Sequence, residues 1–185
     1  YIIYDNLDRP VLTQDANQKA KSPDEWLFTK YDVLGRVIYT GIHISNSLIS
    51  NLRAEFKNKE TGENYESKVT PGYLGSHYTN NNFPKTNITI LTINYYDDYA
   101  FNRAGTGDSV TTLDGKESTD RLKGLATGSR VKVLGTDNWI TTVSYYDEKA
   151  RPIHVYSKNE YLETTDIVES ELDFIGKVLE TKTTH

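Results

Sequence analysis

One short pattern recurs along this chain and constrains its fold more than any other feature. Each copy has an aspartate that follows a tyrosine or leucine and precedes a basic residue by four positions. The copies are Tyr4–Val11, Tyr31–Ile38, Tyr146–Ile153 and Leu172–Leu179, with a damaged copy at Tyr96–Ala100. Internal repetition usually determines architecture, because each copy is one structural unit that packs on its neighbours.

Each copy predicts a strand, a tight turn and a second strand. The aspartate can hydrogen-bond to the backbone ahead of it, and Gly35 and Gly176, three residues later, accept left-handed dihedral angles. We therefore expect these two turns to share one type, with both glycines at positive φ. Asp8 replaces the glycine in the first copy and is still acceptable there. Ala150 and Ala100 fit less well, so we expect those two turns to differ in geometry.

The segments on either side of the turns have strand composition. Trp26–Tyr31 and Trp139–Tyr146 are rich in aromatic and β-branched residues, and Val37–Thr40 and Ile153–Tyr156 continue in the same way after the turns. The sequence predicts an all-β fold made of tandem hairpins.

The pattern Tyr-Asp-x-x-Gly-Arg of Tyr31–Arg36 resembles the YD repeat of Rhs (rearrangement hotspot) and teneurin-type proteins. Longer strings are similar to Rhs-repeat proteins of Bacteroidetes, and the resemblance covers most of the chain. These strings are Tyr31–Gly41, Lys123–Ser129 and Trp139–Pro152.

The resemblance implies a large hollow β-shell, as in toxin-complex proteins, of which this chain would be one segment. In that family the shell often encloses a C-terminal polymorphic toxin domain, and the polypeptide is exported, in Bacteroidetes by type IX secretion. The chain itself contains no recognisable toxin segment. The implied partners are the remainder of the same polypeptide and the secretion machinery, and the implied location is secreted or at the bacterial cell surface.

The repeats divide the chain. Residues 1–41 hold two repeats, 42–88 an insertion, 89–100 the degenerate repeat, 101–138 a loop-rich insertion, and 139–185 two repeats. In the first insertion, the apolar spacing of Leu48, Ile49, Leu52 and Phe56 predicts one amphipathic helix over residues 45–57 that packs on its own sheet. We also expect a turn at residues 61–64, a polar loop at residues 14–25 and one helical turn at residues 118–122.

Composition excludes several classes of function. The chain has 185 residues, 36% of them hydrophobic, and a net charge of −5 without a basic cluster, which argues against nucleic-acid binding. It has no cysteine, so thiol catalysis, cysteine–metal sites and disulfides are impossible. It contains no apolar run long enough to span a membrane, so we expect no membrane insertion.

No catalytic motif stands out, and we expect neither an enzyme nor a cofactor. The four histidines are widely separated, and the acidic stretch from Asp108 to Asp120 does not match a calcium loop. The adjacent acids Asp97–Asp98 and Asp147–Glu148 cannot act as a glycosidase pair, because neighbouring strand residues point to opposite faces. A glycan-active enzyme is the least favoured alternative.

We assign the repeat residues a structural role. Arg9, Arg36, Arg151 and Lys177 are expected to reach carboxylates or turn carbonyls of the next repeat, while the tyrosines stack between hairpins. The alternative is an adhesin-like module that binds a carbohydrate or another surface through tyrosine. The candidate residues are Tyr4, Asp5, Arg9, Tyr31, Asp32, Gly35, Arg36, Tyr96, Asp97, Tyr146, Asp147, Arg151, Asp173, Gly176 and Lys177.

Overall fold

The computed structural model describes residues 1–57 and 64–185, and this part of the chain is mostly antiparallel β-structure. The strand order follows the sequence order. The turn predicted at residues 61–64 falls largely outside the described residues. The chain forms two compact units, residues 1–93 and 94–185, and each is described separately.

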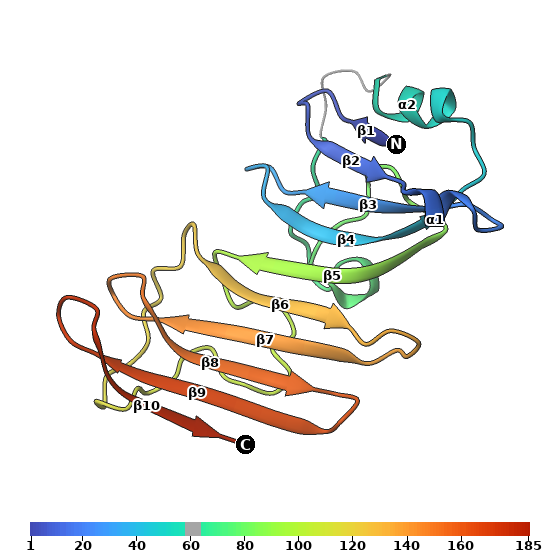
Figure 1. Cartoon of the computed structure of the whole chain (residues 1–185). Coiled ribbons are helices and arrows are strands. Elements are labelled where there is room, and N and C mark those ends of the chain that lie inside the picture. The colour runs from blue at the N-terminus through green and yellow to red at the C-terminus, as the bar shows by residue number, and fades with distance from the viewer. Residues whose placement is uncertain (58–63) are drawn as a thin grey trace. The chain divides into compact units, whose positions relative to one another are not determined.

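The first unit is built on antiparallel strands that each pair with the next strand in sequence (Figure 1). These strands are β1 (Ile2–Tyr4), β2 (Pro10–Thr13), β3 (Glu25–Tyr31), β4 (Val37–Ile44) and β5 (Ile88–Tyr96), the last of which extends into the second unit. The strands of the second unit pair in the same way. They are β6 (Ala126–Lys132), β7 (Trp139–Tyr146), β8 (Pro152–Asn159), β9 (Thr164–Leu172) and β10 (Val178–Thr184).

In the first unit, β3 shows which face of the sheet is buried. Trp26, Phe28 and Lys30 are at most 3% exposed, whereas Leu27 between them is 44% exposed, as the strand period of two requires. The first insertion covers this buried face: Tyr78 packs edge-on against Tyr39 of β4, with ring centroids 5.9 Å apart. The polar side chain of Lys30 therefore lies in the core.

In the second unit, aromatic side chains from the second insertion cover one face of the sheet. Phe101 stacks on Tyr95 with a centroid separation of 3.9 Å, and Tyr99 packs on Tyr145 at 4.9 Å. Phe101 lies directly over Gly128, where a Cβ atom would meet the ring at 2.4 Å. The glycine makes room for the ring.

The helix predicted in the first insertion is present as α2 (Ile49–Lys57), which lies against β1. Leu52 and Phe56 are buried, but Leu48 precedes the helix and is 70% exposed. Two other expectations were wrong. The polar link after β2 contains α1 (Ala16–Lys19), and residues 118–122 form no helix.

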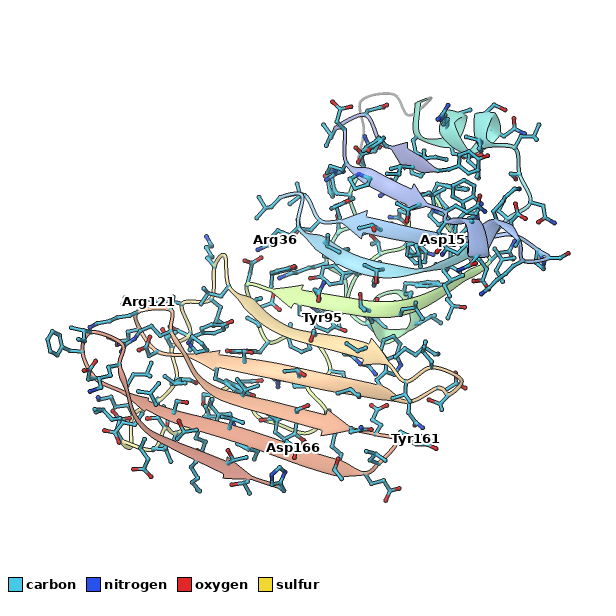
Figure 2. The ribbon with its side chains drawn as sticks, in the orientation of Figure 1. Asp15, Arg36, Tyr95, Arg121, Tyr161 and Asp166 are labelled. Carbon is cyan, nitrogen blue, oxygen red and sulfur yellow. The ribbon has the colours of Figure 1, made fainter. Side chains whose placement is uncertain are left out.

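The α1 helix forms because Asp15, which Figure 2 labels, completes a capping box with Gln18. In this box, each side chain accepts a hydrogen bond from the other residue's backbone N–H. The other helical segment of the described residues is a single 3₁₀ turn, η1 (Tyr73–Gly75), in the first insertion.

Candidate functional site

All four complete repeats form the same turn. In each, the aspartate N–H donates to the carbonyl of the residue four positions later, and the N–H three positions later donates back to the aspartate carbonyl. This is the three-residue hairpin loop in which a type I turn is followed by a left-handed residue and a bulge, and the strand register shifts beside these turns. The turns are Asp5–Arg9, Asp32–Arg36, Asp147–Arg151 and Asp173–Lys177.

The residue three positions after each aspartate has a left-handed backbone conformation, which confirms one prediction and corrects another. Gly35 and Gly176 have φ of 77° and 94°, as expected. Ala150 has φ of 60° in the same kind of turn, as does Asp8 at 57°, so the expectation that the Ala150 turn would differ was wrong. The hydrogen bonds around Ala150 hold it in a conformation that costs an alanine about 1–2 kcal/mol.

The aspartate side chain organises each turn from within. Its Oδ1 atom accepts the N–H groups two and four positions later, and where arginine is the basic residue its Oδ2 atom accepts the arginine Nε–H. Burial raises the pKa of Asp147, but the hydrogen bonds from Arg151 and Lys149 outweigh it and hold that pKa below its ordinary value. In the last turn the basic residue is Lys177, and its backbone N–H donates to Asp173 Oδ1 at 2.9 Å.

An arginine from one turn contacts the next turn in both hairpin pairs. Arg151 Nη1 donates to the carbonyl of Asp173 at 2.8 Å and lies 3.5 Å from the position that a Cβ atom of Gly176 would take. Arg9 lies in the same relation to the second turn, with its Nη1 3.7 Å from the corresponding position at Gly35 and its guanidinium 4.4 Å from the Tyr31 ring centre.

The repeat tyrosines also form contacts between strands. The Tyr31 hydroxyl donates to Pro10 O at 2.7 Å, and the Tyr146 hydroxyl donates to Ala126 O at 2.6 Å. Tyr4 is 52% exposed on β1. The Arg36 side chain binds Asp32 of its own turn.

The degenerate copy keeps its aspartate but does not form a hairpin turn. Tyr96 ends β5, and the Asp97 N–H donates to Leu125 O at 3.0 Å, while Asp97 Oδ1 accepts the Gly124 N–H at 2.7 Å. In the structure, the second insertion therefore runs between β5 and β6, over residues 98–124 rather than 101–138, and it begins and ends at the position of the missing turn. Ala100 lies within that insertion, so its expected turn is absent.

The sequence also contains a turn of this type that the aspartate pattern did not reveal. Thr112 N–H donates to Lys116 O, Gly115 N–H donates to Thr112 O, and the threonine hydroxyl replaces the carboxylate in accepting the Lys116 N–H. Gly115 has φ of 77°. Glycine three positions after the threonine and lysine four positions after it were the available signal.

The first insertion is anchored to its sheet by a buried charged cluster. Lys30 Nζ lies 3.0 Å from Glu66 Oε1, and the two side chains are 3% and 0% exposed. Glu66 also accepts the Thr79 hydroxyl and the N–H groups of Asn81 and Asn82. Burial raises the pKa of Glu66, but Lys30 and these donors together bring it below its ordinary value.

The second insertion is anchored by tyrosine hydroxyls. Tyr145 of β7 donates to Gly107 O at 2.6 Å, Tyr156 of β8 donates to Ala104 O at 3.0 Å, and Tyr99 donates to Ser144 O at 2.8 Å. Burial raises the pKa of Tyr99 and of Tyr145, so these hydroxyls stay protonated donors at neutral pH.

The second unit contains a cleft of about 640 Å³ beside its repeat turns. The Thr112–Lys116 turn forms one wall, and residues 147–151 and 170–174 form the other. The hydrogen bond from Lys116 to Asp114 lowers the Asp114 pKa to about 2, and Phe174 is 81% exposed at the rim.

The histidines lie apart, each with its own partner. His154 lies 3.6 Å from Glu169, His43 contacts Asn87 O, and His77 contacts the Thr70 hydroxyl. Within residues 1–57 and 64–185, no cluster of histidine and carboxylate side chains is suited to hold a metal ion. No helix in the described part of the chain is long and apolar enough to cross a membrane.

Comparisons with protein-family models, with curated proteins and with solved structures found no match to this chain.

Proposed function

We propose that this chain is a structural segment of a secreted or cell-surface YD-repeat protein. In this proposal, its sheet forms part of a shell that encapsulates or presents another part of the same polypeptide, such as a C-terminal toxin domain. The resemblance of the Tyr-Asp-x-x-Gly-Arg pattern motivates the family assignment.

One observation carries the proposal: the arginine of one turn lies against the left-handed residue of the next turn in two separate hairpin pairs. A contact repeated in register is how units of an array hold their neighbours, and it requires no ligand. β10 exposes all seven of its residues, which is consistent with a surface that receives further structure.

The test uses the polypeptide that contains this chain. Electron microscopy should show a closed β-shell, and limited proteolysis should leave an enclosed segment intact until the shell is unfolded. An open, extended array in which every segment is cleaved at the same rate would refute the proposal.

A second candidate is an adhesin-like module that binds a carbohydrate or another surface. The cleft in the second unit favours it, because polar side chains line it and the exposed Phe174 ring offers a face on which a sugar could stack. Binding of this chain to a glycan array, lost in Phe174→Ala, would support the adhesin instead of the shell.

A further inference from the structure

Lys30 is a lysine in a core position. It occupies the buried face of β3 beside Phe28, and lysine is rarely buried unless it is paired. Its amine donates to three acceptors on the first insertion: Glu66 Oε1 at 3.0 Å, Asn82 O at 2.7 Å, and Asn80 Oδ1. A primary amine, a carboxylate and a side-chain carboxamide therefore meet in one buried site.

The site is held rigidly. Glu66 is fixed by donors on both oxygens, and the Asn80 amide group is oriented by a hydrogen bond from its Nδ2 to Lys85 O at 2.9 Å. A small pocket of about 20 Å³ lies beside Lys30 and Glu66, and Phe56 and Phe83 form part of its wall. A space of that size holds about one water-sized molecule.

We propose that Lys30 and Asn80 are joined by an intramolecular isopeptide bond, formed spontaneously with Glu66 as general base and general acid. The bond would link Lys30 Nζ to Asn80 Cγ and tie strand β3 covalently to the first insertion.

The reaction balances without any added reagent. Glu66 takes a proton from the Lys30 ammonium, and the neutral amine attacks Asn80 Cγ to give a tetrahedral intermediate. The Cγ–Nδ2 bond then breaks as Glu66 passes protons to the departing nitrogen. Lys30 Nζ loses two hydrogens in total, and the Asn80 nitrogen leaves with them as ammonium, which carries away the positive charge. Glu66 ends as the carboxylate with which it began.

The fold supplies proximity and burial, which the same reaction between free groups in water lacks. Holding the amine against the carboxamide replaces a bimolecular encounter by an intramolecular one, a large rate advantage. Burial disfavours the charged form of a lysine, and the Glu66 carboxylate, 3.0 Å away, is placed to accept its proton. Asn80 is only partly buried, which leaves the ammonium a route to solvent. The chain has no cysteine, so no disulfide can join the insertion to the sheet.

The test is intact-mass spectrometry of the denatured 185-residue chain. The expected mass is below the sequence mass by one ammonia. A tryptic digest should contain a branched peptide that joins Lys30 to Asn80, because trypsin does not cleave after an acylated lysine. This peptide also distinguishes the bond from a succinimide, which loses ammonia without joining two peptides.

Three variants should each keep the full sequence mass. Lys30→Arg keeps the charge but removes the nucleophile, Asn80→Ala removes the acyl group but keeps the Lys30–Glu66 pair, and Glu66→Gln removes the proton carrier. Asn80→Ala preserves the buried Lys30–Glu66 pair. It therefore still tests the proposal if Lys30→Arg or Glu66→Gln fails to fold. A wild-type chain with the full sequence mass, and with cleavage after Lys30, would overturn the proposal.

Discussion

The two units use the same repeat turn but fix their insertions in different ways. In the first unit, the insertion is held through Lys30 and Glu66, whose side chains are almost wholly removed from solvent. In the second, neutral hydroxyls of Tyr99, Tyr145 and Tyr156 hold it. A buried charge is costly when its partner is removed, whereas a lost hydroxyl costs one hydrogen bond. Removing one member of the first anchor should therefore destabilise its unit more than removing one tyrosine hydroxyl destabilises the second unit.

The largest effect is expected from Glu66→Gln. It leaves the Lys30 ammonium buried without a countercharge and should lower the unfolding free energy of the first unit by about 3–5 kcal/mol. Its counterpart Tyr99→Phe removes one hydrogen bond from the second unit and should cost about 1 kcal/mol.

The two tryptophans allow each unit to be followed separately, because Trp26 lies in the first and Trp139 in the second. Denaturant unfolding monitored in Trp139→Phe and Trp26→Phe backgrounds would report the two free energies. Equal losses for the two anchor variants would contradict the comparison.

A smaller difference is expected between two glycines beneath aromatic rings. A Cβ atom at Gly41 would lie 2.2 Å from the backbone carbonyl of Thr89. At Gly128 the nearest atom, at 2.4 Å, belongs to the Phe101 ring, and the backbone carbonyl of Thr142 is farther away, at 2.8 Å. A side chain can shift more easily than a paired strand. Gly41→Ala should therefore cost more than Gly128→Ala, within a range of about 1–3 kcal/mol. Thermal melts in the two single-tryptophan backgrounds would measure both, and the reverse order would show that the second sheet is the more rigid.

Glycine substitutions at the left-handed turn positions should raise the stability of the protein rather than lower it. Ala150→Gly relieves a conformation that alanine adopts reluctantly and should raise stability by up to about 1 kcal/mol. Asp8→Gly should change it by only a few tenths of a kcal/mol, because aspartate tolerates this region better. Chemical denaturation would measure the two free energies, and a destabilised Ala150→Gly would show that the alanine methyl group makes a packing contact that outweighs the strain.

The smallest effect concerns two buried histidines. Burial lowers the pKa of His43 and of His154 below the ordinary value of 6.5, although Glu169 opposes the shift at His154. The unfolded chain therefore binds protons at a higher pH than the folded chain. The stability that this provides is present above about pH 6.5 and is lost as pH falls through the lowered folded values. Denaturation at about pH 7.5 and about pH 5.5 should show this loss in each unit, and His154→Gln should abolish it in the second. An unchanged slope in that variant would exclude His154 as the source.

The sequence predicted the turns well because their determinants are local. The Asp32 side chain binds N–H groups only two and four residues away, and the glycine requirement follows from the same short segment. Ala150 shows where this reasoning fails: the aspartate and arginine of its turn impose the left-handed conformation without glycine. The helix α1 was missed although its capping box lies entirely within the local sequence.

The buried cluster at Lys30 could not be predicted in full, because Lys30 and Glu66 are 36 residues apart and only the fold brings them together. The sequence did indicate that Lys30 is buried. Trp26, Phe28 and Lys30 alternate along one strand, which places the lysine in a core position and implies a buried partner.

In each hairpin pair, we conclude, the second turn is stabilised by the arginine of the first. Arg151→Lys tests this directly, because lysine already occupies the equivalent position in the last turn as Lys177. The measurement is amide hydrogen exchange at Ile175 and Lys177, whose N–H groups bind Asp173 Oδ1 in the next turn. The exposed Arg121, changed to lysine, is the matched control.

We expect both amides to exchange about fivefold faster in Arg151→Lys, as a loss of about 1 kcal/mol would produce, and to be unchanged in Arg121→Lys. Faster exchange confined to residues 147–151, with Ile175 and Lys177 unaffected, would contradict it.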